Sequence, residues 1–174
     1  MDLPSFFHEL QNSGLGQWVN TAGPAYPIIE TFHVIALSLV FGTILIVDLR
    51  LLGLASGSRL FSRVAADLLR LTWGGFVLAA ITGVLLFLPN AESLYLNVFF
   101  QTKMVLLALA GLNMFVFELV TARHVKTWDA AIPPPNAARI AGLLSIGLWL
   151  AVIVFGRLIG FAPVSDDPFA MMIS

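Results

Sequence analysis

Cysteine is absent from this 174-residue chain, and charged residues make up only 11% of it. Without cysteine the protein forms no disulfide, no thiolate metal site and no cysteine nucleophile. Nine Lys and Arg residues stand against ten Asp and Glu residues, for a net charge of -1. This balance excludes the basic surface that nucleic-acid binding requires. Any chemistry must use the three histidines, a few charged side chains or a cofactor.

The motifs of common hydrolases are missing as well. The sequence contains no H-E-x-x-H motif, no Ser/His/Asp arrangement of recognisable spacing and no pair of carboxylates on one helix face. Hydrolytic catalysis is therefore not expected.

Apolar residues dominate what is present. They make up 59% of the chain, whereas a soluble domain carries about 25% charged residues. A helix that crosses a bilayer needs about 20 mostly apolar residues, and proline residues at 89 and 133–135 separate such runs because proline cannot continue a helix. The sequence predicts four spans, at 28–52, 71–88, 99–120 and 138–161.

Basic residues are concentrated in the loops after the first and third predicted spans. The opposite side carries acidic residues, including Glu9 and Glu92. By the positive-inside rule, this distribution predicts a multi-pass protein of the bacterial inner (cytoplasmic) membrane with both termini in the periplasm. The basic residues on which the prediction rests are Arg50, Arg59, Arg63, Arg70, Arg123, Lys126 and Arg139.

Two amphipathic segments flank the first span. Residues 2–19 predict a short helix on the outer face, capped by Asp2 or Ser5. Residues 59–71 predict a helix on the inner surface between spans one and two, where anionic headgroups would attract its arginines; a solvated connector is the alternative. The expected fold is all-α: residues 1–174 form one integral membrane domain, a bundle of four transmembrane helices.

Three basic side chains are predicted to reach a similar depth. A residue four or five positions into a span lies roughly 6–8 Å below its edge, since a helix rises about 1.5 Å per residue. His33, Lys103 and Arg157 lie about that far from the outer ends of the first, third and fourth spans. Ionisable residues inside a membrane are functional candidates. We expect the three to line one outward-facing site, with Glu30, one turn before His33, bonded to the imidazole or paired with a cation.

Each of these residues also has a structural interpretation. Lys103 can extend toward the headgroups, and His33 can be satisfied by a backbone carbonyl or by Glu30. Arg157 lies between Gly156 and Gly160, a small-xxx-small spacing that is typical of a close helix contact.

Other polar residues are expected to be structural. Asn113 is predicted to form a hydrogen bond between helices, and Thr82-Gly83 to allow close packing. Ion pairs among the charged residues at the inner ends are expected to close the bundle; these residues are Asp48, Arg50, Glu118, Arg123, His124 and Lys126.

A group of these residues resembles known membrane proteins. The stretches "FHVIALSLVFGTILIVDLRLLGL" and "TGVLLFLPNAESLYLNVFFQTKMVLLALAGLN" look like an uncharacterised bacterial four-span family, similar in layout to the CopD copper-resistance membrane domain and the HemJ-type protoporphyrinogen oxidases. His33, Gly42, Thr82, Gly83 and Lys103 match the shared pattern, over about two thirds of the chain. The resemblance implies a haem-linked or copper-linked role at the periplasmic face. The chain departs from membrane b-type cytochromes in offering one intramembrane histidine, not two.

The requirements of haem can be compared with the residues present. Haem b needs an axial imidazole, cationic partners for its propionates and apolar walls. His33 supplies the metal ligand, and Lys103 and Arg157 supply the cations. Met104 is a candidate cofactor-binding residue as sixth ligand, with His8 as another possibility. The expected walls are Phe32, Phe41, Phe76, Phe99 and Phe100.

The sequence thus favours a protein that binds haem b and transfers electrons to or from a quinone or a periplasmic or membrane protein partner. A copper-handling protein is an alternative, although Cu(I) prefers soft ligands and Met104 and Met114 have no clustered partner. A non-catalytic anchoring subunit of a larger complex, or a cofactor-free site for a quinone or lipid headgroup, is also open.

Overall fold

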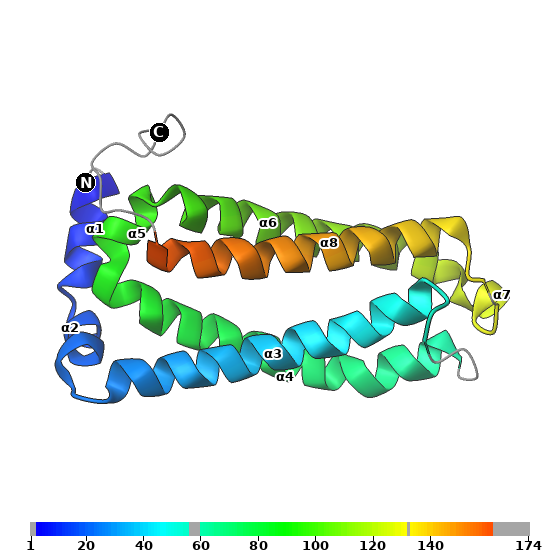
Figure 1. Ribbon diagram of the computed structural model, residues 1–174, viewed down its shortest axis with the longest axis horizontal. Coiled ribbons are helices and arrows are strands. Elements are labelled where there is room, and N and C mark those ends of the chain that lie inside the picture. The colour runs from blue at the N-terminus through cyan, green and yellow to red at the C-terminus, as the bar shows by residue number, and fades with distance from the viewer. Residues whose placement is uncertain (1–2, 56–59, 132, 162–174) are drawn as a thin grey trace.

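Four long helices form the body of the protein (Figure 1). The computed structural model describes residues 3–55, 60–131 and 133–161. The long helices are α3 (Ala25–Leu51), α4 (Phe61–Phe87), α6 (Val98–Val116) and α8 (Asn136–Leu158). Each belongs to a helical stretch that is long and apolar enough to cross a membrane. The protein is a multi-pass, all-α membrane protein, as expected.

Short helices join and cover the long ones. A 3-10 turn (Leu88–Asn90) and α5 (Ala91–Leu96) connect α4 to α6. At the other end, α6 continues through a π-helical turn (Phe117–Thr121) and a 3-10 turn (Ala122–His124) into α7 (Val125–Trp128). A last 3-10 turn, Ile159–Phe161, follows α8. We refer to the two ends of the bundle as the α1 end and the α7 end.

The amino-terminal segment forms two helices, not the single one expected. They are α1 (Leu3–Gln11) and α2 (Gly14–Thr21), which lie crosswise over one end of the bundle in Figure 1. The break occurs because the Ser13 hydroxyl accepts a hydrogen bond from the Gly16 N–H at 3.2 Å and so caps α2. Ser5 lies inside α1 instead of capping it, and Asp2 lies outside the described residues.

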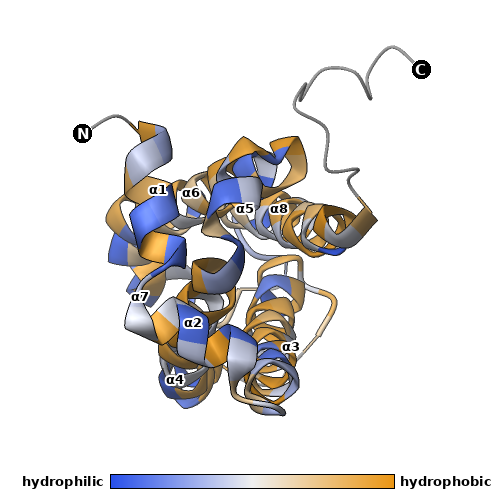
Figure 2. Cartoon of the chain, turned by 90° about the vertical axis from the view of Figure 1, so that its left-hand side faces the viewer, coloured by the Kyte–Doolittle hydropathy of each residue, from blue (hydrophilic) through white to orange (hydrophobic). Residues whose placement is uncertain are grey.

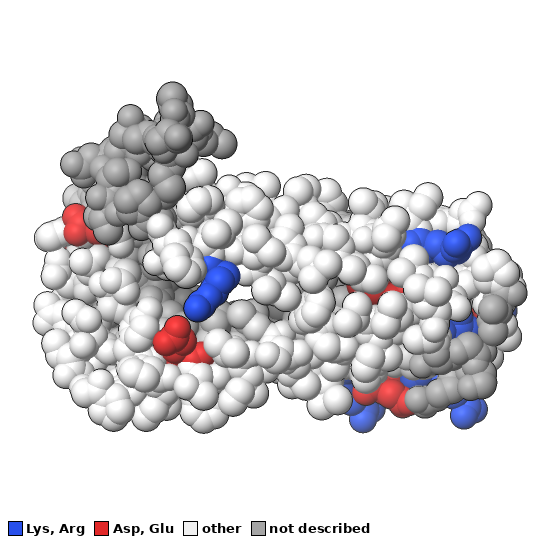
Figure 3. All heavy atoms as spheres, viewed as in Figure 1, with Lys and Arg blue, Asp and Glu red and all other residues white. Residues whose placement is uncertain are grey.

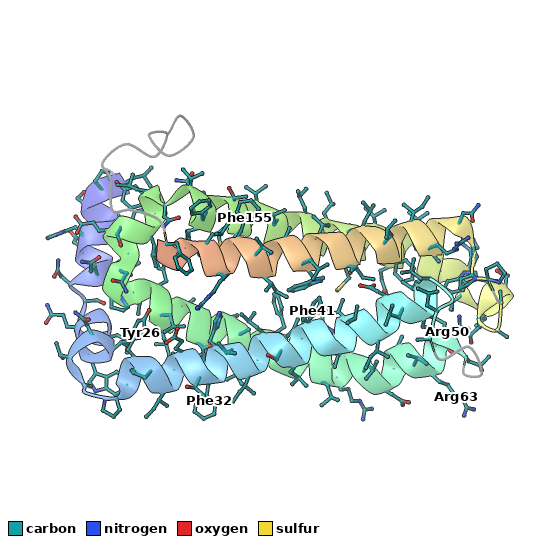
Figure 4. The ribbon with its side chains drawn as sticks, viewed as in Figure 1. Tyr26, Phe32, Phe41, Arg50, Arg63 and Phe155 are labelled. Carbon is teal, nitrogen blue, oxygen red and sulfur yellow. The ribbon has the colours of Figure 1, made fainter. Side chains whose placement is uncertain are left out.

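The predicted inner-surface helix is wrong as a separate element. Residues 61–71 are the first turns of α4, which runs unbroken from Phe61, and Arg59 lies outside the described residues. Phe61 and Val64 are buried, so this segment packs against the bundle, whereas its charged residues stay exposed. Figure 4 shows Arg63 projecting outward.

Asp129, just after α7, anchors the start of α4. Its carboxylate accepts hydrogen bonds from the Ser62 N–H at 2.8 Å and from the Ser62 hydroxyl at 2.7 Å. The Asp129 carbonyl accepts from Arg50 Nη2 at 3.0 Å. Burial raises the pKa of Asp129, but the bonds from Ser62 and the charge of Arg50 outweigh it and hold this pKa below its ordinary value.

The helices pack as two pairs. α3 lies along α4, α6 lies along α8, and α3 also contacts α8. Gly75 permits the first pairing, because a Cβ there would lie 3.0 Å from Val40 Cγ2. Gly142 permits the contact of α3 with α8, because its Cβ would lie 3.1 Å from the Asp48 carbonyl oxygen.

A compact apolar core is found at the α7 end. It consists of Leu51, Phe61, Trp128 and Ala138. Around the rest of the bundle, many large apolar side chains are exposed. Figure 2, viewed from the α1 end, shows that hydrophobic residues predominate in the long helices. This distribution is the one expected where lipid replaces water as the solvent.

Candidate functional site

A cavity of about 2770 Å³ lies between the α3/α4 pair and the α6/α8 pair. Pockets for small ligands are usually about 300–1,000 Å³, so this one has room for more than one. α3 lines it with Tyr26, Glu30, His33, Leu37 and Val40, which recur at the spacing of one helix face. Figure 3 shows a hollow between α3 and α8 near the α1 end, where basic and acidic side chains face each other.

His33 is held against α4 by Thr82. Its Nδ1 lies 2.8 Å from Thr82 Oγ1, and the same hydroxyl lies 2.7 Å from the Leu78 carbonyl oxygen. A carbonyl can only accept, so the hydroxyl proton points to Leu78 and the imidazole donates through Nδ1–H. This assignment, inferred from the hydrogen-bond network, leaves the lone pair on Nε2.

Gly83 makes the position of the imidazole possible. A Cβ at residue 83 would lie 3.2 Å from His33 Cε1, which is too close without movement of the ring. Thr82 and Gly83 were expected to serve helix packing. Packing is what they do, but the group they pack against is the histidine.

Lys103 approaches the same region from α6. Its Cδ, Cε and Nζ lie 3.6 Å from the position of a Cβ on Gly156, so its side chain lies along the α8 glycine. The ammonium is near enough to His33 for an electrostatic interaction. Among the described residues, Lys103 forms no ion pair or hydrogen bond.

The remaining predicted residues surround this pair. Glu30 and the exposed Arg157 line the cavity, with Arg157 Cζ 5.8 Å from the centre of the Phe161 ring. Met104 also lines it and is 49% exposed. His33 bonds to Thr82 and to the Ala79 backbone carbonyl, one of the two expected kinds of partner, and Glu30 interacts with it only through its charge. We call the part of the cavity lined by Glu30, His33, Gly83, Lys103, Gly156 and Arg157 the histidine compartment.

The expected aromatic walls are partly wrong. Phe76, Phe99 and Phe100 line the cavity, but Phe32 and Phe41 do not. Figure 4 shows Phe32 projecting away from the bundle, because it precedes His33 by one residue and so lies about 100° around the helix. Aromatic residues that were not predicted as walls also line the cavity, among them Phe87, Trp149 and Phe155.

The helix α1 covers the cavity at its own end, where Leu3 and Phe7 contribute to the lining. Phe7 stacks on Tyr95 with ring centres 4.5 Å apart. His8 Nδ1 lies 3.2 Å from Glu92 Oε1, and His8 Nε2 lies 3.1 Å from Asn12 Nδ2. Both ring nitrogens are thus engaged, and neither is available to a metal in this arrangement.

Toward the α7 end the cavity carries a different set of polar groups. Asp48 lines it and is only 4% exposed. The Ser145 hydroxyl forms a hydrogen bond with the Asp48 carboxylate, but Asp48 Oδ2 has no hydrogen-bond partner. The prediction of an ion pair for Asp48 is wrong, because no Lys or Arg among the described residues pairs with it.

Asn113 bonds to α8 one turn before Ser145. Its Nδ2 donates to the Ala141 carbonyl of α8 at 3.0 Å, which confirms the predicted hydrogen bond between helices. Ala141 is one turn before Ser145, so the amide and the hydroxyl are neighbours. We call the part of the cavity lined by Asp48, Asn113 and Ser145 the aspartate compartment. An acidic residue within an apolar run was the sequence signal that could have identified it.

The described residues contain no group of three His, Cys, Asp or Glu side chains that could hold a metal ion. A metal bound by protein side chains alone would lack such a ligand set here. Haem differs because its porphyrin supplies four of the ligands and the protein needs to supply only one or two.

Comparison with known proteins gives a family but no function. Neither a curated protein nor a solved structure matches the chain. A family model matches residues 6–162, which is most of the chain. The protein therefore belongs to DUF6644, a family of unknown function.

Proposed function

We propose that this membrane protein binds haem b in the histidine compartment, with His33 as axial ligand, and transfers electrons to or from a quinone or a periplasmic protein partner. The observation that carries the proposal is the orientation of His33. Its Nδ1–H is donated to Thr82, which leaves the lone pair on Nε2, and the residue lines the cavity. A ligating histidine usually has its other ring nitrogen held in this way.

The surrounding residues fit the rest of the group. Lys103 and Arg157 would hold the two propionates, which gives Lys103 the partner that it lacks among the described residues. Phe87, Phe99, Phe100 and Phe155 would contact the macrocycle. When bound, haem supplies one-electron redox chemistry. The protein's part is to hold the iron ligand, to neutralise the carboxylates and to exclude water.

The sequence resemblance supports the same proposal. Of the residues that carry it, His33 contacts Thr82 and Gly83 and interacts with the charge of Lys103. These residues come from three helices and converge on one compartment. Their convergence favours a shared ligand over four separate packing roles.

The test is an absorption spectrum. The protein is expressed with ample haem, purified, and examined for its Soret band and its reduced-minus-oxidised spectrum. We expect His33→Ala to lose both, whereas His124→Ala, an exposed histidine near the α7 end, retains them. A colourless wild type would return the protein to the cofactor-free alternatives, of which an anchoring subunit predicts a stoichiometric partner on purification in gentle detergent.

We also propose that the α1 end faces the periplasm. The support is the concentration of basic side chains at the α7 end, visible in Figure 3, because positively charged loops remain in the cytoplasm. A reporter at the carboxyl terminus that requires export should be active. Activity only of a cytoplasmic reporter there would contradict this orientation.

A further inference from the structure

The aspartate compartment holds a second set of polar groups that the haem proposal does not use. Asp48 from α3 bonds to Ser145 from α8, and Asn113 from α6 bonds to the α8 carbonyl one turn before Ser145; all three line the cavity. His33 and Asp48 are separated by fifteen residues of α3, or about 22 Å along the helix. A ligand held at His33 therefore leaves the aspartate compartment to another molecule.

The hydrogen bonds of this compartment determine what that molecule must offer. In its ionised form the Asp48 carboxylate can only accept, so the Ser145 hydroxyl then donates its proton to Asp48 and turns its lone pairs to other groups. The Asn113 amide uses Nδ2 to donate to the Ala141 carbonyl, and its Oδ1 bonds to no described residue. Asp48 Oδ2 is also without a partner. With Asp48 ionised, all three free atoms are hydrogen-bond acceptors, so the complementary ligand is a donor.

The position of the compartment restricts the ligand further. Ser145 lies nine residues into α8, or about 14 Å along the helix. The walls around it include Met114, Phe117 and Trp149. A molecule that reaches this place must dissolve in the membrane and be largely apolar. The carboxylate disfavours anionic lipid headgroups by like-charge repulsion.

We propose that the aspartate compartment binds the head group of a lipid-soluble hydroquinone. Its two phenolic O–H groups match the acceptors on Ser145 and Asn113, and its ring matches the apolar walls. Asp48 acts as a positioning residue that orients the Ser145 hydroxyl. A quinone has two carbonyl acceptors and no O–H donor, so the compartment prefers the reduced form. The proposed function includes a quinone but gives no site for it, and this inference supplies that site. It rests on the proposed function only for the exchange of electrons.

Binding is tested in the full-length protein without haem, in the His33→Ala background, so that failure of the haem proposal does not affect the result. The probe is a tritium-labelled decyl benzoquinol under anaerobic conditions, measured by scintillation proximity in detergent. The corresponding benzoquinone competes in a parallel titration. We expect saturable binding, with the quinol at least about tenfold tighter than the quinone, the factor of one hydrogen bond to a polar site.

Variants then assign the contacts. Ser145→Ala should weaken quinol binding about tenfold or more and reduce the preference for quinol over quinone. Asp48→Asn should reduce the same preference, because an amide can donate to Ser145 as well as accept from it. The matched control is Ser38→Ala, whose exposed hydroxyl bonds only to Val34 of its own helix and which should bind like the parent.

The proposal is overturned by any of three results: no saturable quinol binding, equal affinity for quinol and quinone, or an unchanged Kd in Ser145→Ala. Thermal unfolding of each variant shows whether it is folded. If Asp48→Asn fails to fold, Ser145→Ala and Asn113→Leu still decide the outcome, because both remove an acceptor and keep the Asp48 carboxyl group; Asn113→Leu also keeps its bond from Ser145.

Discussion

The two compartments of the cavity share walls of the same kind but present opposite polar groups. The histidine compartment offers two cationic side chains and an imidazole, whereas the aspartate compartment offers three hydrogen-bond acceptors. Each contains a polar group that lacks a partner among the described residues, Lys103 in one and Asp48 Oδ2 in the other. Burying such groups costs free energy. The propionates of haem would give Lys103 a partner, whereas the proposed quinol bonds to Ser145 and Asn113 and leaves the burial cost of Asp48 Oδ2 in place.

The largest effect is expected from filling the space beside the imidazole. Gly83→Val places a side chain where a Cβ already lies 3.2 Å from His33 Cε1, so it should abolish haem binding and destabilise the protein by about 1–3 kcal/mol. Gly74→Val, on the same helix with no atom within 4 Å of its Cβ, is the control. Haem absorbance and thermal unfolding measure the two effects. Equal losses in both variants would show that His33 is not the sensitive contact.

Removal of a cation should affect the histidine compartment alone. Lys103→Leu and Arg157→Leu should each weaken haem affinity about tenfold, the factor of one charge-assisted hydrogen bond, and leave quinol binding unchanged. Lys126→Leu, an exposed residue of α7, should change neither. If quinol binding falls in parallel with haem affinity, the two compartments are not separate sites.

Weakening the α7 end should disturb the aspartate compartment more than the histidine compartment. Ser62→Ala removes a 2.7 Å hydrogen bond to Asp129 and should lower the free energy of unfolding by about 1–2 kcal/mol.

Because the pKa of Asp129 is lower in the folded protein, its stabilising contribution is present above the unfolded pKa of about 3.9 and is lost as the pH falls through the folded value. The difference in unfolding temperature between wild type and Asp129→Asn should therefore shrink below about pH 4. A difference independent of pH would contradict this account.

The smallest effect should be a gain in stability. Asp48→Asn replaces a buried carboxylate, one oxygen of which is unpaired, by a neutral group of the same shape. Without ligand, the variant should be more stable by about 1 kcal/mol while it loses the preference for quinol. Such a trade of stability against function is typical of ligand sites. Destabilisation would instead assign Asp48 to the structural framework.

The lengths of the apolar runs predicted the four spans, because the hydropathy and the proline positions can be read directly from the sequence. The start of α4 was misplaced because Arg63 and Arg70 interrupt the apolar run without interrupting the helix. The break before α2 depends on one hydrogen bond of Ser13, a capping residue that the prediction of a single helix did not take into account. The bond between His33 and Thr82 joins residues 49 positions apart, and no periodicity specifies which turns of α3 and α4 meet. Asp48 was expected to form an ion pair because charged residues of both signs lie near the inner ends of the spans, but in the structure its carboxylate bonds to Ser145 instead.

The covering of both ends of the bundle has a consequence for how any ligand arrives. α1 is fastened over one end by the Phe7–Tyr95 stack and the His8–Glu92 contact, and the Leu51–Phe61–Trp128–Ala138 core fills the other. The hollow between α3 and α8 opens sideways, toward the hydrocarbon. A ligand taking this route is drawn from a two-dimensional reservoir, so occupancy follows its mole fraction in the lipid, and dilution of the aqueous phase at constant membrane composition leaves it unchanged.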